Sequence, residues 1–392
     1  MTKLKFVMTT SFYPPYHVGG ACLHVKWLAE ELARQGHEVH VMFSLDAYEI
    51  KRGRVQVVDI EPSAVHLYPL RSPRGRLETL LVYLQGMSTY FSGEFERLLK
   101  KVSPDVVHHH NISLLGYDLL RKRGSYLNLY TAHDYWLICQ LNDFFRNGLP
   151  CTGNRFCPVC ALRSRRPPQL WRRNKAFAHA IRDVDLAIAP SNYLHRTLSE
   201  KTELSLVTIP NFVPPPPGDI PLSGFSDYFL FVGMLDKHKG IMKLVELFKD
   251  YWGEIDARLL VAGTGSLERR LQTYVKKSGL EDVVHFLGWC DHHSLYPLYR
   301  DAIALVVPSL CPENCSSVVL EALSLGTPVV ASNMGGLPEI AGLQGEGHVC
   351  DLPNLKNALI KARNTSPNHQ QIQDIYQRHF SPEGFISRYL EL

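Results

Sequence analysis

Short runs of apolar residues alternate with amphipathic segments along the first half of the chain. Apolar runs at 4–10 and 37–43 flank residues 19–36, where apolar positions recur at helical spacing and Gly36 ends the pattern. Further runs of strand length, with helical segments between them, lie at 105–110, 125–133, 185–191 and 204–210. Strands that alternate with helices in this way predict a parallel sheet covered by helices.

A second series of the same kind follows a proline-rich stretch at 210–224. No helix or central strand accommodates this stretch, because each proline fixes φ and removes a hydrogen-bond donor. We therefore expect a stiff linker between two domains. The strands of the second series are expected at 227–235, 257–265, 282–289, 302–310 and 327–336.

These patterns predict an α/β fold with two Rossmann-like, doubly wound parallel-sheet domains. A chain of 392 residues is long enough for each domain to bury its own core. Ligands bind at the carboxyl ends of parallel strands, so we expect the two domains to face a shared cleft. The predicted divisions are a first domain at 1–209 with a cysteine-rich insert at about 136–166, the linker at 210–224, a second domain at 225–375, and a C-terminal helix at 376–392 that packs back toward the first domain.

Composition narrows the class of protein. Hydrophobic residues at 45% and charged residues at 20% are typical of a soluble globular protein. The N-terminus fits a buried strand better than a signal peptide, and no apolar stretch approaches the roughly 18 to 20 residues of a spanning helix. The sequence therefore predicts a cytoplasmic protein.

The net charge of +4 hides an asymmetry between the two halves. Residues 1–208 carry 27 Lys+Arg against 18 Asp+Glu, whereas the remainder carries 15 against 20. The basic excess is concentrated at 71–76, 121–123 and 161–177. This asymmetry suggests that one domain meets an anionic partner, although a solvated basic face explains it equally well.

Glycine-rich turns at strand ends, at 17–21, 262–265 and 334–336, indicate a phosphate-bearing ligand. Their backbone amides can approach a phosphate closely. The first turn does not match G-x-G-x-x-G, so a dinucleotide-binding interpretation is poorly supported. The glycines expected at the ligand are Gly19, Gly20, Gly233 and Gly265.

An ordered set of motifs extends over nearly the whole chain. It comprises SFYPPYHVGGA, PDVVHHHN, TAHD, DLAIAPS, TIPNFV, FVGMLDKHKG, LLVAGTGSLE, VHFLGW and PENCSSVVLEALSLGTPVVASNMGGLPE. Each motif is weak alone, but the ordered set resembles the retaining glycosyltransferases of family 4, which have the GT-B fold. The resemblance implies that the second domain holds a sugar nucleotide, that the first supplies the acceptor site, and that the cleft closes for transfer.

The resemblance assigns roles to two glutamates that lie eight positions apart. Glu313 would bind donor-sugar hydroxyls and Glu321 the ribose, and eight helical residues rise ~12 Å, about the separation of those groups. The alternative makes Glu313 a helix cap and Glu321 a surface residue. The helix is expected to begin near 314–316, and its positive end suits a diphosphate. The amides assigned to the diphosphate are those of Asn314, Cys315, Ser316 and Ser317, and the first three stand where the family usually has Gly-Phe-Gly.

Further donor-side roles follow from the resemblance. Lys239 matches the lysine that neutralises the leaving diphosphate, and His133 matches the histidine that hydrogen-bonds the donor sugar. Met234 stands where the family often has an arginine, so Lys237 or His238 would have to compensate. Ordinary explanations are a solvated lysine and a structural histidine. Trp289 either contacts the base or packs in the core.

The acceptor side is expected in the first domain. Strand alternation sends neighbours among the histidines at 108–110 to opposite faces, so at most two of them face the cleft. We assign His110 and Asp134 to the acceptor side.

The mechanism implied by the resemblance requires no protein nucleophile. The leaving diphosphate is thought to take the acceptor proton on the same face, so the protein positions the reactants and stabilises charge. Glu313 and Glu321 are too far apart for a hydrolase pair. No metal or other cofactor is expected for catalysis, and DVD at 183–185 is interpreted as a helix-to-strand connection. The donor expected is a UDP-hexose, with glucose as the sugar.

Four cysteines gather in the insert: Cys139, Cys151, Cys157 and Cys160. In a cytoplasmic chain this grouping suggests a structural zinc site, but only one C-x-x-C is present. Disulfides and free thiols are the alternatives.

The basic segment at 161–177 adjoins this insert and mixes arginines with aromatic residues. We expect it to border the acceptor site and to contact a saccharide or lipid-linked acceptor, or an anionic membrane on its inner face. Two other functions are considered: a sugar-nucleotide epimerase or phosphorylase of the same fold, and nucleic-acid binding through the cysteines and the basic segment. The second explains neither the glutamates nor the glycine-rich turns, so no nucleic acid is expected.

Overall fold

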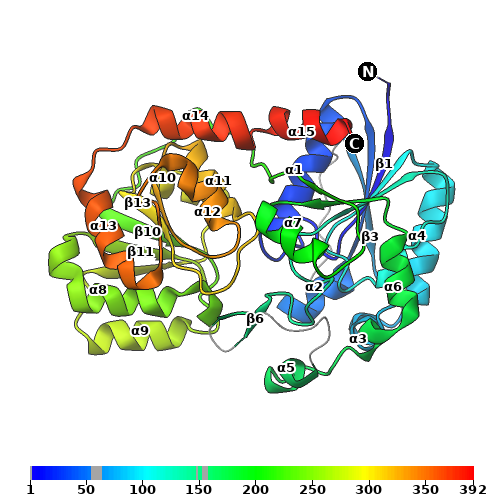
Figure 1. Cartoon of the computed structure of the whole chain (residues 1–392), viewed down its shortest axis with the longest axis horizontal. Coiled ribbons are helices and arrows are strands. Elements are labelled where there is room, and N and C mark those ends of the chain that lie inside the picture. The colour runs from blue at the N-terminus through cyan, green and yellow to red at the C-terminus, as the bar shows by residue number, and fades with distance from the viewer. Residues whose placement is uncertain (1, 54–63, 147–148, 152–157) are drawn as a thin grey trace. The chain divides into compact units, whose positions relative to one another are not determined.

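The structure is a computed structural model that describes residues 2–53, 64–146, 149–151 and 158–392 (Figure 1). The described residues fall into two compact units. Apart from the short segment Phe145–Cys151, which belongs to the second unit, the chain passes from the first unit to the second after Ile209 and returns after Ser387. The first unit lies within Met1–Phe144, Thr152–Ile209 and Arg388–Leu392, and the second within Phe145–Cys151 and Pro210–Ser387.

A seven-stranded sheet forms the centre of the first unit, in the order β3-β2-β1-β4-β5-β8-β9. All of its neighbouring strands are parallel, which confirms the predicted sheet type. The chain builds the sheet outward from β1 in both directions, which is the doubly wound arrangement. Its strands are β1 (Lys5–Thr9), β2 (Glu38–Ser44), β3 (Val65–Leu70), β4 (Val106–His109), β5 (Leu127–Thr131), β8 (Leu186–Ala189) and β9 (Leu206–Thr208).

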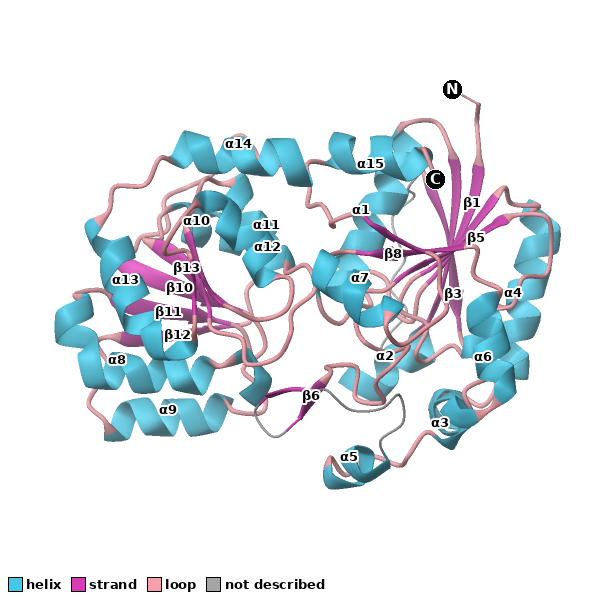
Figure 2. Cartoon of the chain, in the orientation of Figure 1, coloured by secondary structure: helices cyan, strands magenta, loops and turns pink. Residues whose placement is uncertain are grey.

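Helices cover both sides of this sheet, with α1 and α7 on one side and α4 and α6 on the other (Figure 2). In α1 the residues Val25, Leu28 and Leu32 recur at helical spacing and are buried. The helices are α1 (Gly20–Arg34), α2 (Leu45–Arg52), α3 (Arg76–Gln85), α4 (Thr89–Val102), α5 (Pro158–Arg163), α6 (Lys175–Arg182) and α7 (Asn192–Ser199), with short 3-10 turns η1 (Tyr117–Leu120) and η2 (Leu170–Arg173).

The second unit contains a six-stranded parallel sheet in the order β12-β11-β10-β13-β14-β15. Its centre is strongly apolar, because Phe229, Leu259 and Ala304 on three adjacent strands are fully buried in one core. The strands are β10 (Tyr228–Val232), β11 (Arg258–Ala262), β12 (Val284–Gly288), β13 (Ala304–Val307), β14 (Val329–Ser332) and β15 (Val349–Cys350); a separate hairpin pairs β6 (Phe145–Arg146) with β7 (Leu149–Pro150).

Helices also lie on both sides of the second sheet, with α8 and α9 on one side and α10 and α11 on the other (Figure 2). The amphipathic α8 buries Leu244, Val245 and Phe248 in the core. The helices are α8 (Ile241–Ile255), α9 (Glu268–Lys277), α10 (His292–Arg300), α11 (Ser317–Ser324), α12 (Leu337–Ala341), α13 (Leu355–Asn364), α14 (His369–Phe380) and α15 (Pro382–Leu390), with 3-10 turns η3 (Lys237–Lys239), η4 (Gly342–Gln344) and η5 (Leu352–Asn354).

The C-terminal region contains two helices where the sequence predicted one. Ser381, between them, has extended φ and ψ and so ends α14 before α15 begins. Tyr376 of α14 donates a hydrogen bond to the Val213 carbonyl at 2.8 Å. In the first unit, the Tyr389 hydroxyl lies 2.9 Å from Nδ1 of His108.

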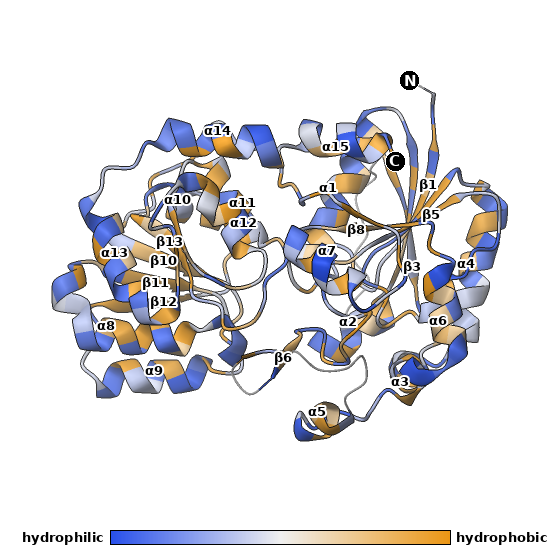
Figure 3. Cartoon of the chain, viewed as in Figure 1, coloured by the Kyte–Doolittle hydropathy of each residue, from blue (hydrophilic) through white to orange (hydrophobic). Residues whose placement is uncertain are grey.

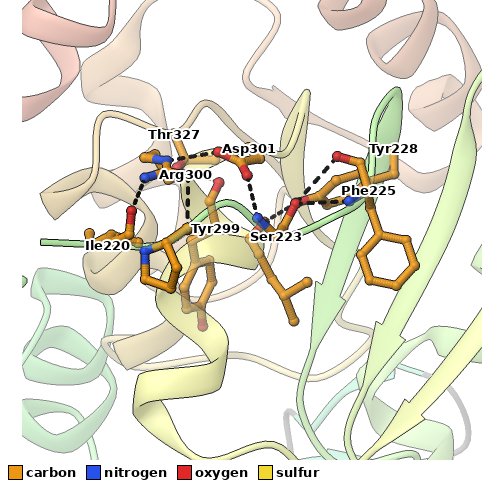
Figure 4. Close-up of polar contacts among 10 residues, drawn as sticks. Ile220, Ser223, Phe225, Tyr228, Tyr299, Arg300, Asp301 and Thr327 are labelled. Carbon is orange, nitrogen blue, oxygen red and sulfur yellow. Dashed lines mark hydrogen bonds and ion pairs between the residues drawn. The ribbon is translucent and has the colours of Figure 1, made fainter.

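The end of the proline-rich segment is fixed to α10 (Figure 4). Arg300, the last residue of α10, donates to the carbonyl oxygens of Ile220 and Pro221 at 2.5 and 3.0 Å. Asp301 accepts a hydrogen bond from the amide of Ser223 at 2.8 Å. These contacts give hydrogen-bond partners to backbone groups of residues 220–223, which lie outside any helix or strand.

Candidate functional site

Three loops, which follow β10, β13 and β14, meet closely at the carboxyl edge of the second sheet. A Cβ on Gly240, which has φ +73°, would collide with the carbonyl oxygen of Pro308 after β13. A Cβ on Gly335, at φ +65°, would collide with the carbonyl oxygen of Glu313, and the Gly336 amide donates to that oxygen at 2.6 Å. Only glycine combines this left-handed backbone with so close an approach. The loops therefore hold Glu313 by its backbone.

The side chain of Glu313 forms an ion pair with Lys239. The Lys239 ammonium donates to Oε1 of Glu313 at 2.6 Å, and the Ser309 hydroxyl donates to the same oxygen at 2.6 Å. Both charged side chains are largely buried, with 24% of Lys239 and 13% of Glu313 exposed. Lys239 ends η3, which follows β10, whereas Ser309 and Glu313 follow β13. The structure thus joins two predicted site residues and adds Ser309.

The pair is ionised at neutral pH. Burial by itself would raise the pKa of Glu313, but the Lys239 charge and hydrogen bonds outweigh it and hold that pKa below its usual value. Burial would likewise lower the pKa of Lys239, but the Glu313 charge outweighs it and raises that pKa. A fixed positive charge is therefore available at the strand ends.

The loop after Glu313 leads into the N-terminus of α11. Ser316 is the N-cap residue, and its side chain makes no capping hydrogen bond. The first amides of a helix have no carbonyl partner within the helix, and the dipole makes that end positive. Ser317 is the first helical residue. Burial raises the pKa of the Cys315 thiol to about 12, so this thiol is neutral at physiological pH. Asn314 to Ser317 thus present amides beside the Lys239–Glu313 pair, and Glu313 itself lies outside the helix.

Glu321, in the middle of α11, is buried with only 5% of its surface exposed, so the surface-residue alternative is wrong. The Tyr299 hydroxyl of α10 donates to Oε2 of Glu321 at 2.8 Å, and Nδ1 of His292 lies 3.8 Å from Oε1. Burial raises the pKa of Glu321 to about 7, although the hydrogen bond from Tyr299 acts in the opposite direction. A carboxyl with this pKa changes charge near neutral pH.

Three donor-side predictions fall on exposed or tightly packed positions. Trp289 has 67% of its surface exposed after β12, so the core-packing alternative is wrong. Met234, where the family often has arginine, is also exposed. Gly265 packs against Leu235, because a Cβ there would lie 2.6 Å from the Leu235 amide nitrogen. Gly233 directly follows β10 and has φ +152°.

In the first unit, histidines gather at the carboxyl ends of β4 and β5. Nδ1 of His110 lies 3.0 Å from Nε2 of His133, and the rings of His108 and His110 are 3.9 Å apart between centroids. His109 points elsewhere and lies 2.7 Å from the Thr9 hydroxyl, as strand alternation requires. Nε2 of His108 lies 2.8 Å from the Thr131 hydroxyl.

These histidines are neutral at physiological pH. Burial lowers the pKa of His108, His110 and His133 far below the usual value, and the neighbouring rings lower it further. A neutral ring carries one donor and one acceptor nitrogen, so the hydrogen bond between His110 and His133 couples their tautomers. The site therefore offers hydrogen-bonding imidazoles and no extra positive charge.

The remaining predicted residues of this unit lie near the same strand ends. Asp134 follows His133, accepts from the Trp136 amide at 2.8 Å, and has a pKa that burial raises to about 6. Gly19, at φ +80°, is the N-cap of α1, and Gly20 begins that helix. His24, one turn further along α1, stacks edge-on against His133 at 5.5 Å between ring centroids.

The sequence did not predict Ser309, Tyr299, His292 or the clustering of His24 with His133. Most of these contacts join distant segments, such as the hydrogen bond between Tyr299 and Glu321, which lie 22 residues apart. A signal did exist for Ser309, because it lies near the end of the strand predicted at 302–310 and four positions before Glu313.

The zinc prediction is only partly covered by the structure. Cys157 lies outside the described residues, whereas Cys139, Cys151 and Cys160 lie within them. Across the part of the chain that is described, no group of three or more His, Cys, Asp or Glu side chains is arranged to hold a metal ion. A zinc site that includes Cys157 remains a prediction.

None of the helices described here combines the length with the apolar composition that crossing a bilayer needs.

Family models match both halves of the chain. Residues 18–215 match the model described as Glycosyltransferase Family 4, and residues 221–374 match the model described as Glycosyl transferases group 1. Together the two models cover most of both sheets, apart from β1, and the loops described above. An uncharacterized glycosyltransferase of Methanocaldococcus jannaschii is 27% identical over 368 residues, which cover 86% of this chain and 82% of that protein.

Solved structures share the fold over nearly the whole chain. Sucrose-phosphate synthase of Thermosynechococcus elongatus aligns with a TM-score of 0.72 at 20% identity and covers 99% of this chain and 98% of its own. HepE of Anabaena, solved with UDP and glucose, aligns with a TM-score of 0.67 at 16% identity and covers 99% and 98%. The chain belongs to glycosyltransferase family 4 and has the two-domain GT-B fold.

Proposed function

We propose that this enzyme transfers a hexose, with glucose as the first candidate, from a UDP-sugar to a saccharide or lipid-linked saccharide. The transfer retains the anomeric configuration, requires no metal and serves polysaccharide or glycoconjugate synthesis. The observation that carries the proposal is the buried Lys239–Glu313 pair beside the N-terminus of α11. HepE, which binds UDP and glucose in its crystal structure, supports the choice of donor.

The donor diphosphate would lie between Lys239 and the amides of Asn314 to Ser317. The ammonium and the positive helix end both stabilise the negative charge that develops as the nucleoside diphosphate leaves. Because Glu313 holds the ammonium at 2.6 Å, Lys239 is pre-positioned before the donor arrives. Little reorganisation is then needed during the reaction.

Glu313 has a second role in this arrangement. Its Oε1 accepts hydrogen bonds from Lys239 and Ser309. A carboxylate has about four lone-pair positions, so acceptor capacity remains for hydroxyls of the donor sugar. Glu321 would accept hydrogen bonds from the ribose hydroxyls, and Trp289 would contact the base from its exposed position.

The first unit would contribute to the sugar and to the acceptor. His133 would hydrogen-bond the donor sugar as a neutral ring held by His110. His110 and Asp134 would lie on the acceptor side, and Gly19 and Gly20 would bring the start of α1 to the donor.

The chemical step then needs no protein nucleophile. The acceptor hydroxyl oxygen forms a bond to the anomeric carbon, while the bond from that carbon to the diphosphate oxygen breaks. The hydroxyl proton passes to the departing diphosphate oxygen on the same face of the sugar. The residues described above bind, orient and stabilise charge.

A thermal-shift panel of UDP, GDP and ADP sugars tests the donor assignment. The correct donor stabilises the folded enzyme by about 2.7 kcal/mol at 100 times its Kd. Lys239→Met should abolish most of the shift, whereas Lys249→Met, at an exposed position of α8 outside the donor site, should preserve it. No shift with any nucleotide sugar, or equal shifts for both variants, would reject this donor site.

Incubation of the enzyme with the donor that binds separates transfer from the alternative reaction. Slow hydrolysis to free nucleotide, or transfer to an added saccharide, is the expected outcome. An isomerised nucleotide sugar with its diphosphate intact would instead identify an epimerase.

A further inference from the structure

Helix α3 presents its apolar face outward. Leu77, Leu80 and Leu84 recur at the i, i+3, i+7 spacing of one helix face, and 54%, 46% and 40% of their surfaces are exposed. A surface helix normally turns such a face toward the core. Here the buried positions are Glu78 and Thr79 together with Val82, while the three leucines stay outside.

The inverted orientation is fixed by polar contacts. Oε1 of Glu78 accepts from the Ser88 hydroxyl at 2.5 Å, and Ser88 caps α4 by accepting from the Phe91 amide at 3.1 Å. Oε2 of Glu78 accepts from the Ser72 hydroxyl at 3.4 Å. Rotating α3 to bury the leucines would break these bonds and expose α4's cap, so the outward leucines are a stable feature of the fold.

Neighbouring elements extend the apolar area. The Tyr83 hydroxyl donates to the Pro167 carbonyl at 3.2 Å, and the Trp171 indole donates to the Tyr83 carbonyl at 3.0 Å, so the segment through η2 lies along α3. Leu170 in this segment has 66% of its surface exposed. The short α5, which precedes this segment along the chain and on which Figure 3 shows apolar residues, also carries exposed Val159 and Leu162.

Basic side chains surround this area. Arg71, Arg74 and Arg76 lie at and before the start of α3, and their acidic partners Glu49 and Glu78 are themselves buried. Residues 158–182 contain seven Lys and Arg residues and no Asp or Glu. Apolar side chains ringed by cations match a bilayer surface, where an acyl boundary lies beneath anionic headgroups.

We propose that this area, the α3 surface, docks the enzyme on a bilayer that carries anionic phospholipids. The α3 surface is defined by Leu77, Leu80, Leu84 and Leu170 with their flanking arginines. The leucines would enter the headgroup region while the arginines remain at the phosphates. Exposed apolar patches of this kind mark interaction sites, and charge selects the bilayer over an uncharged partner.

The inference deepens the proposed function, because a bilayer-bound enzyme would meet a lipid-linked acceptor at the surface that carries it. The docking contact is nevertheless independent of the donor site, since the two involve different residues. An experiment can therefore reject the docking proposal while the donor site stands, or reject the donor site while the docking proposal stands.

Vesicle flotation with the full chain tests the proposal. Vesicles of phosphatidylcholine with about one third phosphatidylglycerol should recover the wild type at least tenfold better than pure phosphatidylcholine. Leu77→Ser/Leu80→Ser/Leu84→Ser should lose at least tenfold of this binding. The matched control Trp252→Ser/Leu343→Ser, which changes exposed apolar residues of the second unit, should bind like the wild type.

Two further variants separate docking from folding and from charge alone. Leu80→Lys replaces one apolar side chain with a cation and should also weaken binding, although the net charge rises. Arg76→Gln/Arg163→Gln should weaken binding to anionic vesicles, whereas Lys276→Gln/Lys277→Gln on α9 should not. Unfolding midpoints of all variants should stay near the wild-type value, because each position is exposed.

Specific outcomes would overturn the proposal. One is equal recovery of the wild type with neutral and anionic vesicles, and another is unchanged binding by the leucine variants. A wild-type dimer in sedimentation that the triple-leucine variant dissociates would make the surface an interface between two copies. Donor turnover without vesicles should be the same in the wild type and all variants. A wild type that turns over the donor normally but shows no preference for anionic vesicles would reject this inference and leave the proposed function standing.

Discussion

At the residue scale, Glu321 shows how burial changes the chemistry of a predicted ligand. Its position on α11 was predicted from the sequence, but its contact with Tyr299 and its pKa of about 7 depend on the packing of α10 against α11. Sequence spacing cannot supply such a value, because desolvation is a property of the assembled core. The same applies to Ser309, whose hydroxyl only reaches Glu313 once the loop after β13 is folded.

The raised pKa of Glu321 predicts a pH-dependent stability. The folded state binds the proton more tightly than the unfolded state, so this contribution is complete below about pH 4.5 and is lost as the pH rises through about 7. The unfolding free energy of the wild type relative to Glu321→Gln should fall by roughly 3 kcal/mol over that window.

Chemical denaturation of both proteins between pH 4.5 and pH 8 measures this difference. Glu321→Gln retains an acceptor for the Tyr299 hydroxyl and removes only the titration, which makes it the appropriate reference. Parallel stability curves for the two proteins would show that Glu321 does not titrate near neutral pH.

At the element scale, the sequence predicted the central strands and one edge strand of each sheet, β9 and β12, but missed the other edge of each sheet. The runs at 4–10 and 302–310 became β1 and β13, because continuous apolar runs are typical of central parallel strands. The edge strands β3 and β15 were missed: β3 contains Pro69 and exposed residues, and β15 has only two residues. The orientation of α3 was also missed, because periodicity identifies a face without showing which way it points.

The packing of loop against loop gives a second prediction at this scale. Gly335→Ala adds a Cβ that collides with the Glu313 backbone, in addition to the strain of φ +65°. Gly345→Ala is a matched control, since Gly345 has φ +107° but nothing within 4 Å of its added Cβ. Both should lose about 1 kcal/mol or more of stability, but only Gly335→Ala should also lower turnover severalfold.

Steady-state kinetics of the two glycine variants checks this expectation. Equal turnover in both would mean that the backbone contact between Gly335 and Glu313 does not position the glutamate for the reaction.

At the scale of the whole molecule, the order of strands and helices was enough to predict two doubly wound sheets, and the ordered set of motifs indicated the family. What the order did not predict are the contacts that fix the proline-rich segment and the C-terminal helix α15. Arg300 and Asp301 anchor the end of the proline-rich segment, and Tyr389 returns to His108 of the first unit. These contacts join positions up to 281 residues apart, and no local pattern encodes them.

The central claim is that the Lys239–Glu313 pair forms the reacting end of the donor site. The most direct test is turnover of the preferred nucleotide sugar by Glu313→Gln, measured together with the affinity of this variant for the free nucleoside diphosphate. Removing a hydrogen-bonding charge at a reacting centre typically costs about 10²- to 10³-fold in kcat. We predict a loss of kcat of that order. The Kd for the nucleoside diphosphate should change less than about threefold, since Lys239 and the α11 amides remain. Wild-type turnover in Glu313→Gln would contradict the account.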